Sequence, residues 1–282
     1  MKKLMTTALA LSLAGARPAC AGRPTGQPAP PSEPPSPCEF ASSEAASSEA
    51  SSAAETTETT ETTEATVLSY DEYMAADLDT EVTIQAYVQA KQSYYAEQGT
   101  ATVYLQDQDG GYFAYDMACT QEEYDAMTEG TQVQITGFKS EWSGEVEIMD
   151  GKLDAILDGD TFVSEPLDVT ELLGTDELES HQNEKVKFTG LTVAPSTDAD
   201  GNEVAFLYNY DGSGEEGSDL YFNVSYNGGT YSFVIESYLC DASSEVYSAV
   251  KNLEVGQTID CEGFLYWYEG ANPHITSVTV TG

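Results

Sequence analysis

The chain has 282 residues, and its 10 Lys and Arg against 49 Asp and Glu give a formal net charge of −39 at pH 7. This length suits two ordinary domains once any export and linker segments are set aside. So large an excess of negative charge repels polyanions, and the composition therefore disfavours nucleic acid as a partner.

The few basic residues are also badly placed for binding anions. Lys2, Lys3, Arg17 and Arg23 all precede the region with folded patterning, and no arginine occurs between residues 67 and 282. Arginine supplies the bidentate geometry that phosphate recognition uses most. The folded region must therefore meet any polyanion with six lysines alone.

Residues 1–22 have the order of a secretory signal peptide, because two lysines precede an apolar run over residues 4–16 that is too short to span a bilayer. Cys20 follows that run and resembles the lipidated cysteine of bacterial lipoproteins, but Arg17 stands where such proteins usually have an apolar residue. Lipidation of Cys20 and simple secretion both stay open. The protein is expected to be exported, either to the cell surface or to the medium, with a lipid on Cys20 as its only contact with a membrane.

Residues 23–66 are first Pro-rich and then rich in Ser, Thr and Glu. Apart from Phe40 this stretch has almost no side chain to bury, so it cannot offset the entropy of ordering itself. We expect a disordered, self-repelling linker that holds the folded region away from a surface.

After residue 66 short β-branched and aromatic runs alternate with Gly and Asp, which is typical of a small all-β domain. The first unit, residues 67–160, is expected to contain three strands, a helix with a Thr120/Glu123 capping box, and two further strands. The expected strands are 81–88, 102–105, 112–115, 132–136 and 145–148, and the helix is 120–127.

Residues 161–282 repeat this order of elements, with a longer loop over residues 195–219 that is expected to hold an extra strand at 204–208. The expected strands are 185–193, 220–224, 231–235, 257–261 and 274–280, and the helix is 244–250. Landmarks in register include Gly137-Phe138 with Gly263-Phe264, and Cys119 with Cys240.

This element order, with a Gly-Phe pair late in the fourth strand, resembles the OB-fold, a five-stranded Greek-key barrel. In particular, the chain resembles the tandem OB-type domains of exported bacterial lipoproteins. The expected fold class is therefore all-β with short helices: two tandem five-stranded OB-like barrels after a disordered tether. The resemblance implies oligonucleotide or oligosaccharide ligands across strands 2 and 3 and the loops joining strands 1–2 and 4–5.

Aromatic residues in those loops are the candidate ligand contacts, since aromatics at a barrel mouth stack on sugars or peptide side chains. At least one of the two tryptophans is expected to be partly exposed, and Trp267 is favoured because it lies between two tyrosines on an alternating strand. The alternative is that these aromatics fill the barrel cores. The candidates are Tyr94, Tyr95, Trp142, Tyr266, Trp267 and Tyr268.

No metal or cofactor is expected. The Asp-Gly runs at 107–110 and 198–203 could supply ligands to calcium, but they lack the full EF-hand spacing and favour ordinary tight turns. Cys240 and Cys261 could form a disulfide or could be small buried hydrophobes, and both interpretations stay open.

Catalysis has little support, because the sequence holds two histidines, His181 and His274, and no catalytic motif. The leading hypothesis is a non-enzymatic extracytoplasmic binding or adaptor module for a neutral or cationic ligand such as a glycan or peptide. A single-stranded nucleic-acid binder and a surface hydrolase are the alternatives.

Overall fold

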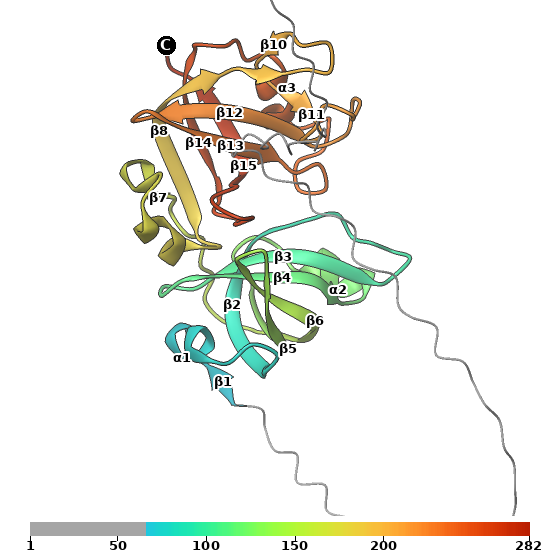
Figure 1. Ribbon diagram of the computed structural model, residues 1–282. Coiled ribbons are helices and arrows are strands. Elements are labelled where there is room, and N and C mark those ends of the chain that lie inside the picture. The colour runs from blue at the N-terminus through green and yellow to red at the C-terminus, as the bar shows by residue number, and fades with distance from the viewer. Residues whose placement is uncertain (1–65) are drawn as a thin grey trace, which may run out of the picture.

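The computed structural model describes residues 66–282, which form two five-stranded β-barrels with short helices (Figure 1). The predicted fold class of tandem OB-like barrels is thus confirmed. The predicted signal peptide, Cys20 and all but the last residue of the predicted linker lie outside the described residues. Among residues 66–282, no helix is both long and apolar enough to cross a membrane.

Barrel 1 follows the expected order of three strands, a helix and two strands. The elements are β2 (Glu81–Lys91), β3 (Thr100–Gln106), β4 (Gly111–Ala118), α2 (Gln121–Ala126), β5 (Gln132–Trp142) and β6 (Glu145–Ile156). The sheet closes into a barrel because β2 pairs with β5 as well as with β3. One pair in the ring, β4 with β6, is parallel.

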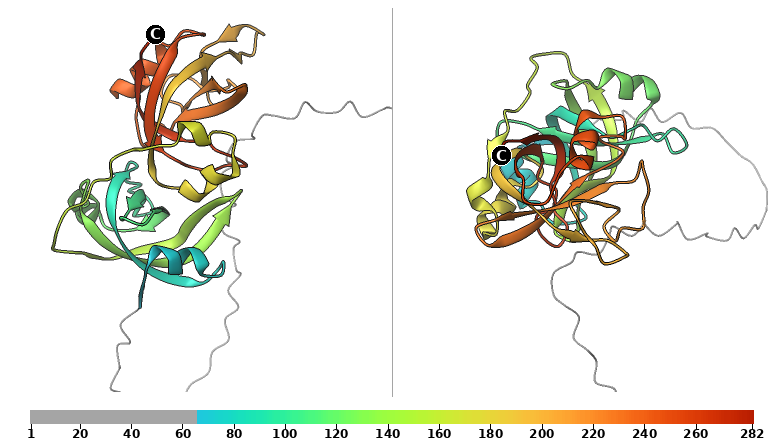
Figure 2. Two further views of the ribbon diagram at one scale, coloured as in Figure 1. Left: turned by 90° about the vertical axis from the view of Figure 1, so that its left-hand side faces the viewer. Right: turned by 90° about the horizontal axis from the view of Figure 1, so that it is seen from above.

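Barrel 2 repeats this order of elements and this closure. The elements are β8 (Lys185–Ala194), β12 (Leu220–Tyr226), β13 (Gly229–Ile235), α3 (Glu245–Lys251), β14 (Thr258–Phe264) and β15 (His274–Val280). Its parallel pair is β13 with β15. The two barrels stand one above the other, joined by a segment that runs along one side (Figure 2).

Each barrel has its own apolar core, built from the inward-facing residues of its strands. In barrel 1 the buried set includes Ile84, Leu105 and Ile135, and in barrel 2 it includes Phe188 and Phe233. This follows from the alternation of the strands, since successive side chains point to opposite faces of a sheet.

Each barrel begins with a short strand that the sequence analysis does not predict. A short strand, β1 (Val67–Leu68), pairs in parallel with β2, and β7 (Leu167–Asp168) pairs in parallel with β8. Helix α1 (Tyr70–Ala75) follows β1, and the 3-10 turns η1 (Thr170–Leu172) and η2 (Asp176–His181) follow β7. Each short strand covers the part of the first barrel strand that β3 or β12 leaves unpaired, and this protects an otherwise open edge.

Local sequence explains where two of the helices begin. Thr120 caps α2, and its reciprocal capping box with Glu123 is present as predicted. Ser69 and Glu72 form the same capping box at α1, an element that the sequence analysis did not anticipate.

The loop of residues 195–219 differs from the single extra strand predicted at 204–208. It carries three two-residue strands instead: β9 (Ser196–Thr197) pairs with β10 (Glu203–Val204), and β11 (Leu207–Tyr208) pairs with the start of β12. The chain turns away between β10 and β11, so one continuous strand cannot form there.

Candidate functional site

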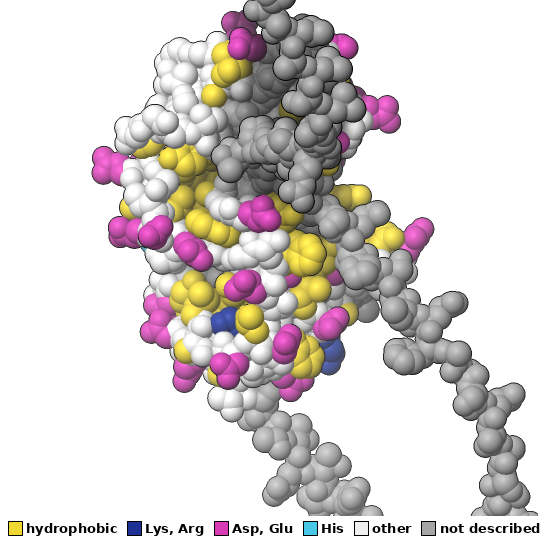
Figure 3. Space-filling model, in the orientation of Figure 1, with side chains coloured by type: hydrophobic (Ala, Val, Ile, Leu, Met, Phe, Trp, Pro, Cys, Tyr) yellow, Lys and Arg dark blue, Asp and Glu magenta, His cyan; other side chains and the backbone are white. Residues whose placement is uncertain are grey.

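The two barrels meet at a packed boundary, here called the seam, where the connection between β14 and β15 lies on the outer face of β3 and β4. Tyr104, Phe113 and Phe264 form a buried aromatic cluster there, separate from both barrel cores. The rings of Tyr104 and Phe264 stack with centroids 4.6 Å apart, and the Tyr104 hydroxyl lies 2.6 Å from Nδ1 of His274. Hydrophobic side chains are visible along the face of the molecule at this level (Figure 3).

In each barrel a loop joins the fourth strand to the fifth, β5 to β6 in barrel 1 and β14 to β15 in barrel 2. The sequence analysis treats these two loops as separate sites, but they come together at the seam. The backbone N–H of Glu269 donates to the Ser143 carbonyl at 2.8 Å, and the side chain of Gln182 donates to the Gly144 carbonyl at 2.9 Å. Gly144 faces the indole of Trp267 so closely that a Cβ at position 144 would contact it. Trp142 and Trp267 therefore belong to one region of the molecule.

Trp267, which the sequence analysis favours as the exposed tryptophan, is partly exposed, but Trp142 is more exposed. Trp142 is 41% exposed, whereas Trp267 is partly buried and packs against the core of barrel 2. Docking of the two loops causes this difference, because Trp267 lies against Gly144 while Trp142 ends β5 outside the contact. At least one indole is partly exposed, as expected.

The other candidate aromatics do not form one site. Tyr94 contacts the tilted ring of Tyr124, packs against the core of barrel 1 and donates its hydroxyl hydrogen to the Cys119 carbonyl at 3.2 Å. Tyr95 is 45% exposed, Tyr266 packs against the seam cluster, and Tyr268 is half-buried. The set divides among a core, a seam and an exposed loop.

Acidic side chains are buried in the seam, which no sequence pattern indicated. Glu145 is fully buried, and its Oε2 accepts a hydrogen bond from the backbone N–H of Trp267 at 2.8 Å. Burial raises the pKa of Glu145 well above its ordinary value, that of Glu147 to about 7 and that of Glu236 to about 8. Burial has the opposite effect on His274 and lowers its pKa to about 3, so this ring is neutral.

In barrel 2 the corresponding sheet face is not covered by another barrel. Tyr104 pairs with Phe113 across β3 and β4, whereas the pairs across β12 and β13 include Asn223 with Ser232 and Ser225 with Thr230. These two pairs of barrel 2 are polar, unlike the aromatic pair of barrel 1. The long loop reaches one end of this face, where Asn223 donates to the Ser196 hydroxyl at 3.1 Å.

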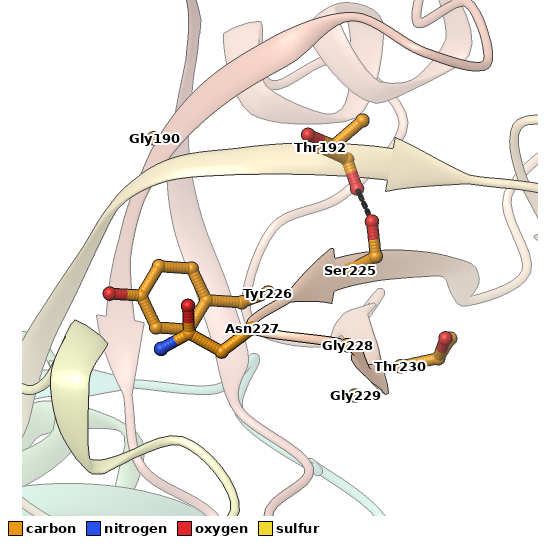
Figure 4. A pocket seen from close by; sticks show the side chains of 8 residues that line it. All are labelled: Gly190, Thr192, Ser225, Tyr226, Asn227, Gly228, Gly229 and Thr230. Atoms are coloured by element: carbon orange, nitrogen blue, oxygen red, sulfur yellow. Dashed lines mark hydrogen bonds between the residues drawn. The ribbon is translucent and has the colours of Figure 1, made fainter.

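The other end of that face holds a shallow hollow of about 350 Å³ at the β12–β13 hairpin (Figure 4). The Ser225 hydroxyl donates to the Thr192 carbonyl at 3.4 Å, while the side chains of Tyr226 and Asn227 lie beside each other at the turn. None of the residues that line the hollow carries a charge. They are Gly190, Thr192, Ser225, Tyr226, Asn227, Gly228, Gly229 and Thr230.

Most lysines of the described region are already engaged by the protein itself. Lys91 and Lys139 donate to backbone carbonyls, and Lys152, Lys185 and Lys251 pair with carboxylates. A phosphate that approached these lysines would compete with these contacts.

The Asp-Gly runs are organised as turns. Asp107 Oδ1 accepts from the backbone N–H groups of Asp109 and Gly110, and Asp198 Oδ1 accepts from those of Asp200 and Asn202. These carboxylates stabilise their own loops, as the turn interpretation predicts. Within residues 66–282, no group of three or more His, Cys, Asp or Glu side chains is placed to hold a metal ion.

Cys240 and Cys261 have free thiols, so the structure does not contain the disulfide considered between them. Both pack against the core of barrel 2, Cys261 fully buried and Cys240 partly so. The interpretation as small hydrophobic residues is the one that the structure supports.

No family model and no curated protein matches the chain. Among solved structures, it is similar to a murine DNA binding protein bound with double-stranded DNA (11% identity, TM-score 0.32, covering 71% of this chain and 99% of that one). It is also similar to the Ifi202 HINa domain in complex with 20-bp double-stranded DNA (12%, 0.32, 72% and 96%) and to a replication protein A heterotrimer bound to single-stranded DNA (15%, 0.25, 70% and 50%). These are distant similarities between proteins with tandem OB-fold domains, and they assign no family or ligand to this chain.

Proposed function

We propose that this protein is a non-enzymatic binding module whose ligand contacts the hairpin end of the open face of barrel 2. The observation that carries the proposal is the difference between the two repeats. Barrel 2 covers the outer face of β3 and β4, whereas the hairpin end of the face formed by β12 and β13 is accessible and holds the uncharged hollow. OB-folds bind their ligands across this face.

The lining of the hollow favours a neutral, hydrogen-bonding ligand such as a glycan or an extended peptide. Ser225, Asn227 and Thr230 supply hydroxyl and amide groups, and Tyr226 supplies a ring. Small-molecule sites combine such polar groups with aromatic surface. The net charge of −39 favours neutral or cationic ligands over anions.

The place of action in this proposal is outside the cytoplasm. The sequence pattern of residues 1–22 supports export, and residues 23–66 have the composition of a tether that would hold both barrels away from a membrane if Cys20 is lipidated. This part of the proposal rests on sequence alone.

The proposal is tested by probing glycan and peptide arrays with the mature chain and repeating the best hit with variants. Ser225→Ala and Asn227→Gly should each weaken binding by roughly 2- to 10-fold, since a single neutral hydrogen bond contributes about 0.5–1.5 kcal/mol. Asn209→Gly is the matched control, because Asn209 also has a positive φ (57°, against 47° for Asn227) and lies outside the hollow. Equal loss in both asparagine variants would contradict the assignment of the site.

Single-stranded nucleic acid is the second candidate ligand, because bases stack on aromatic rings and β3 and β4 carry Tyr104, Phe113 and Tyr115. The engaged lysines and the cover of barrel 2 argue against it. A gel-shift experiment at low salt separates the two candidates, since tight and salt-sensitive binding would favour nucleic acid. Turnover of any array glycan or peptide would favour the hydrolase instead.

A further inference from the structure

Three carboxyl groups from the two barrels lie at the seam, and of these Glu236 is partly exposed. Glu145 and Glu147 project from β6 of barrel 1, and Glu236 follows β13 of barrel 2. Glu145 is fully buried and Glu147 is 6% exposed. Burying an ionised carboxylate is costly unless a cation or several hydrogen bonds compensate it.

Compensation in the seam is sparse. The Oε1 atom of Glu145 accepts no hydrogen bond of ordinary geometry, because the neighbouring Asn183 amide donates to the Val146 carbonyl at 2.9 Å. Glu236 accepts a bond of 2.9 Å from the backbone N–H of Leu239, and the backbone of Tyr238 also favours its ionised form.

The titratable groups around the three carboxyls provide no cation. Among the described residues, those that face the carboxyls from the packed elements include no lysine or arginine. They are Tyr70 and Tyr73 of α1, Tyr104 of β3, Tyr115 of β4, Tyr221 of β12, Tyr266, Asp219, Cys240 and the neutral His274. Neither a salt bridge nor a complete set of hydrogen bonds therefore supports the ionised forms.

We propose that the seam is a carboxyl-gated lock, in which barrel 2 docks on barrel 1 while Glu145, Glu147 and Glu236 are protonated and loosens as they ionise. The contacts that would loosen are those that bury the carboxyls. They are chiefly the contact of the Trp267 loop with Glu145 and the approach of Tyr266 to Glu147. Loosening would uncover the aromatic face of β3 and β4, which is the sheet face that OB-folds use for ligands.

The direction of the pH dependence follows from the raised pKa values. In the docked protein, burial raises the pKa of Glu147 from 4.5 to about 7, and burial together with the charge of Asp219 raises that of Glu236 from 4.5 to about 8. To the extent that docking supplies this burial, the docked state binds protons more tightly than the open state. Docking is therefore strongest below pH 4.5, weakens as the pH rises through 7 and 8, and changes little above that range. His274, with a pKa of about 3, stays neutral throughout this window.

The test uses the full chain carrying Trp142→Phe, so that Trp267 is its only tryptophan. Acrylamide quenching, corrected for fluorescence lifetime, and small-angle scattering are measured at pH 5 and pH 8.5. The Trp267 indole should be quenched more strongly at pH 8.5, and the radius of gyration should increase while the barrels stay folded. Each unit by which docking raises a carboxyl pKa corresponds to about tenfold in the docking equilibrium.

Removal of the three carboxyls provides the decisive comparison. Glu145→Gln/Glu147→Gln/Glu236→Gln should abolish the pH dependence, and the equally charged control Glu81→Gln/Glu141→Gln/Glu262→Gln, at three exposed positions, should keep it. If the triple variant does not fold, Glu236→Gln alone should reduce the response. Equal quenching at both pH values in the parent chain, or a pH response that survives the triple substitution, would overturn the proposal.

Discussion

At the scale of single residues, burial decides the chemistry more than residue type does. His274 is one of two histidines in the chain, and burial beside Tyr104 keeps its ring neutral. Its Nδ1 shares a hydrogen bond with the Tyr104 hydroxyl in the seam. The sequence analysis assigned no catalytic role to this histidine. The structure places it inside an aromatic contact, with its ring stacked on that of Tyr266 at 4.3 Å.

We predict that Tyr104→Phe destabilises the protein through His274. The substitution removes the hydroxyl that lies 2.6 Å from Nδ1 and leaves a buried polar atom without this partner, which costs about 1–3 kcal/mol. Urea unfolding measures the change. Tyr95→Phe, at a position that is 45% exposed, should leave the unfolding free energy within experimental error, and a similar loss in both variants would contradict the role of the buried bond.

At the scale of elements, both barrels have a glycine at the same point of the pairing between the fourth and fifth strands. Gly137 and Gly263 occupy equivalent positions, and the pairing register shifts beside each of them. A Cβ at position 263 would collide with the backbone carbonyl of His274, and one at position 137 would collide with Ile148. Only glycine allows such a close approach of two backbones.

We expect Gly263→Ala to destabilise barrel 2, because the obstacle is backbone and cannot rotate away. The cost should be about 1–3 kcal/mol, as for other overpacked sites. Thermal unfolding of the variant provides the measurement. Gly159→Ala is the control, since a Cβ there meets nothing closer than 3.9 Å, and unchanged stability of Gly263→Ala would refute the close approach.

At the scale of the whole molecule, the two repeats are alike in topology and different in what their surfaces contact. Phe138 and Phe264 follow the equivalent glycines, yet Phe138 is 41% exposed and Phe264 is 2% exposed. The seam accounts for this, because Phe264 packs on Tyr104 in the seam cluster whereas Phe138 lies outside that cluster.

This asymmetry predicts how the barrels unfold. At pH 5, where docking is strongest, calorimetry should show one cooperative transition, since the seam couples the barrels. Phe264→Ala removes the ring that stacks on Tyr104 and should cost about 3–5 kcal/mol, separating the transition into two. Phe138→Ala, at the equivalent exposed position, should preserve a single transition. Two transitions in the parent chain would show that the seam is too weak to couple the barrels.

The sequence by itself determined the local features of this protein: the strand alternation, the Thr120 cap, the two repeats and the closed OB-like topology that their order implies. These follow from interactions between residues close in the chain, or from the period of side chains along a strand. The prediction that phosphate binding is unfavourable rests on the net charge of the sequence and stays a prediction.

Only the tertiary structure decided which sheet face is accessible, which tryptophan is more exposed and which carboxyl groups are desolvated by burial. Those outcomes depend on residues far apart in sequence, such as Tyr104 and His274, which meet across 170 positions. Nothing in the pattern of either repeat specifies how it docks on the other. The uncharged hollow of barrel 2 and the buried carboxyls of the seam were missed for this reason, since each is created by long-range packing.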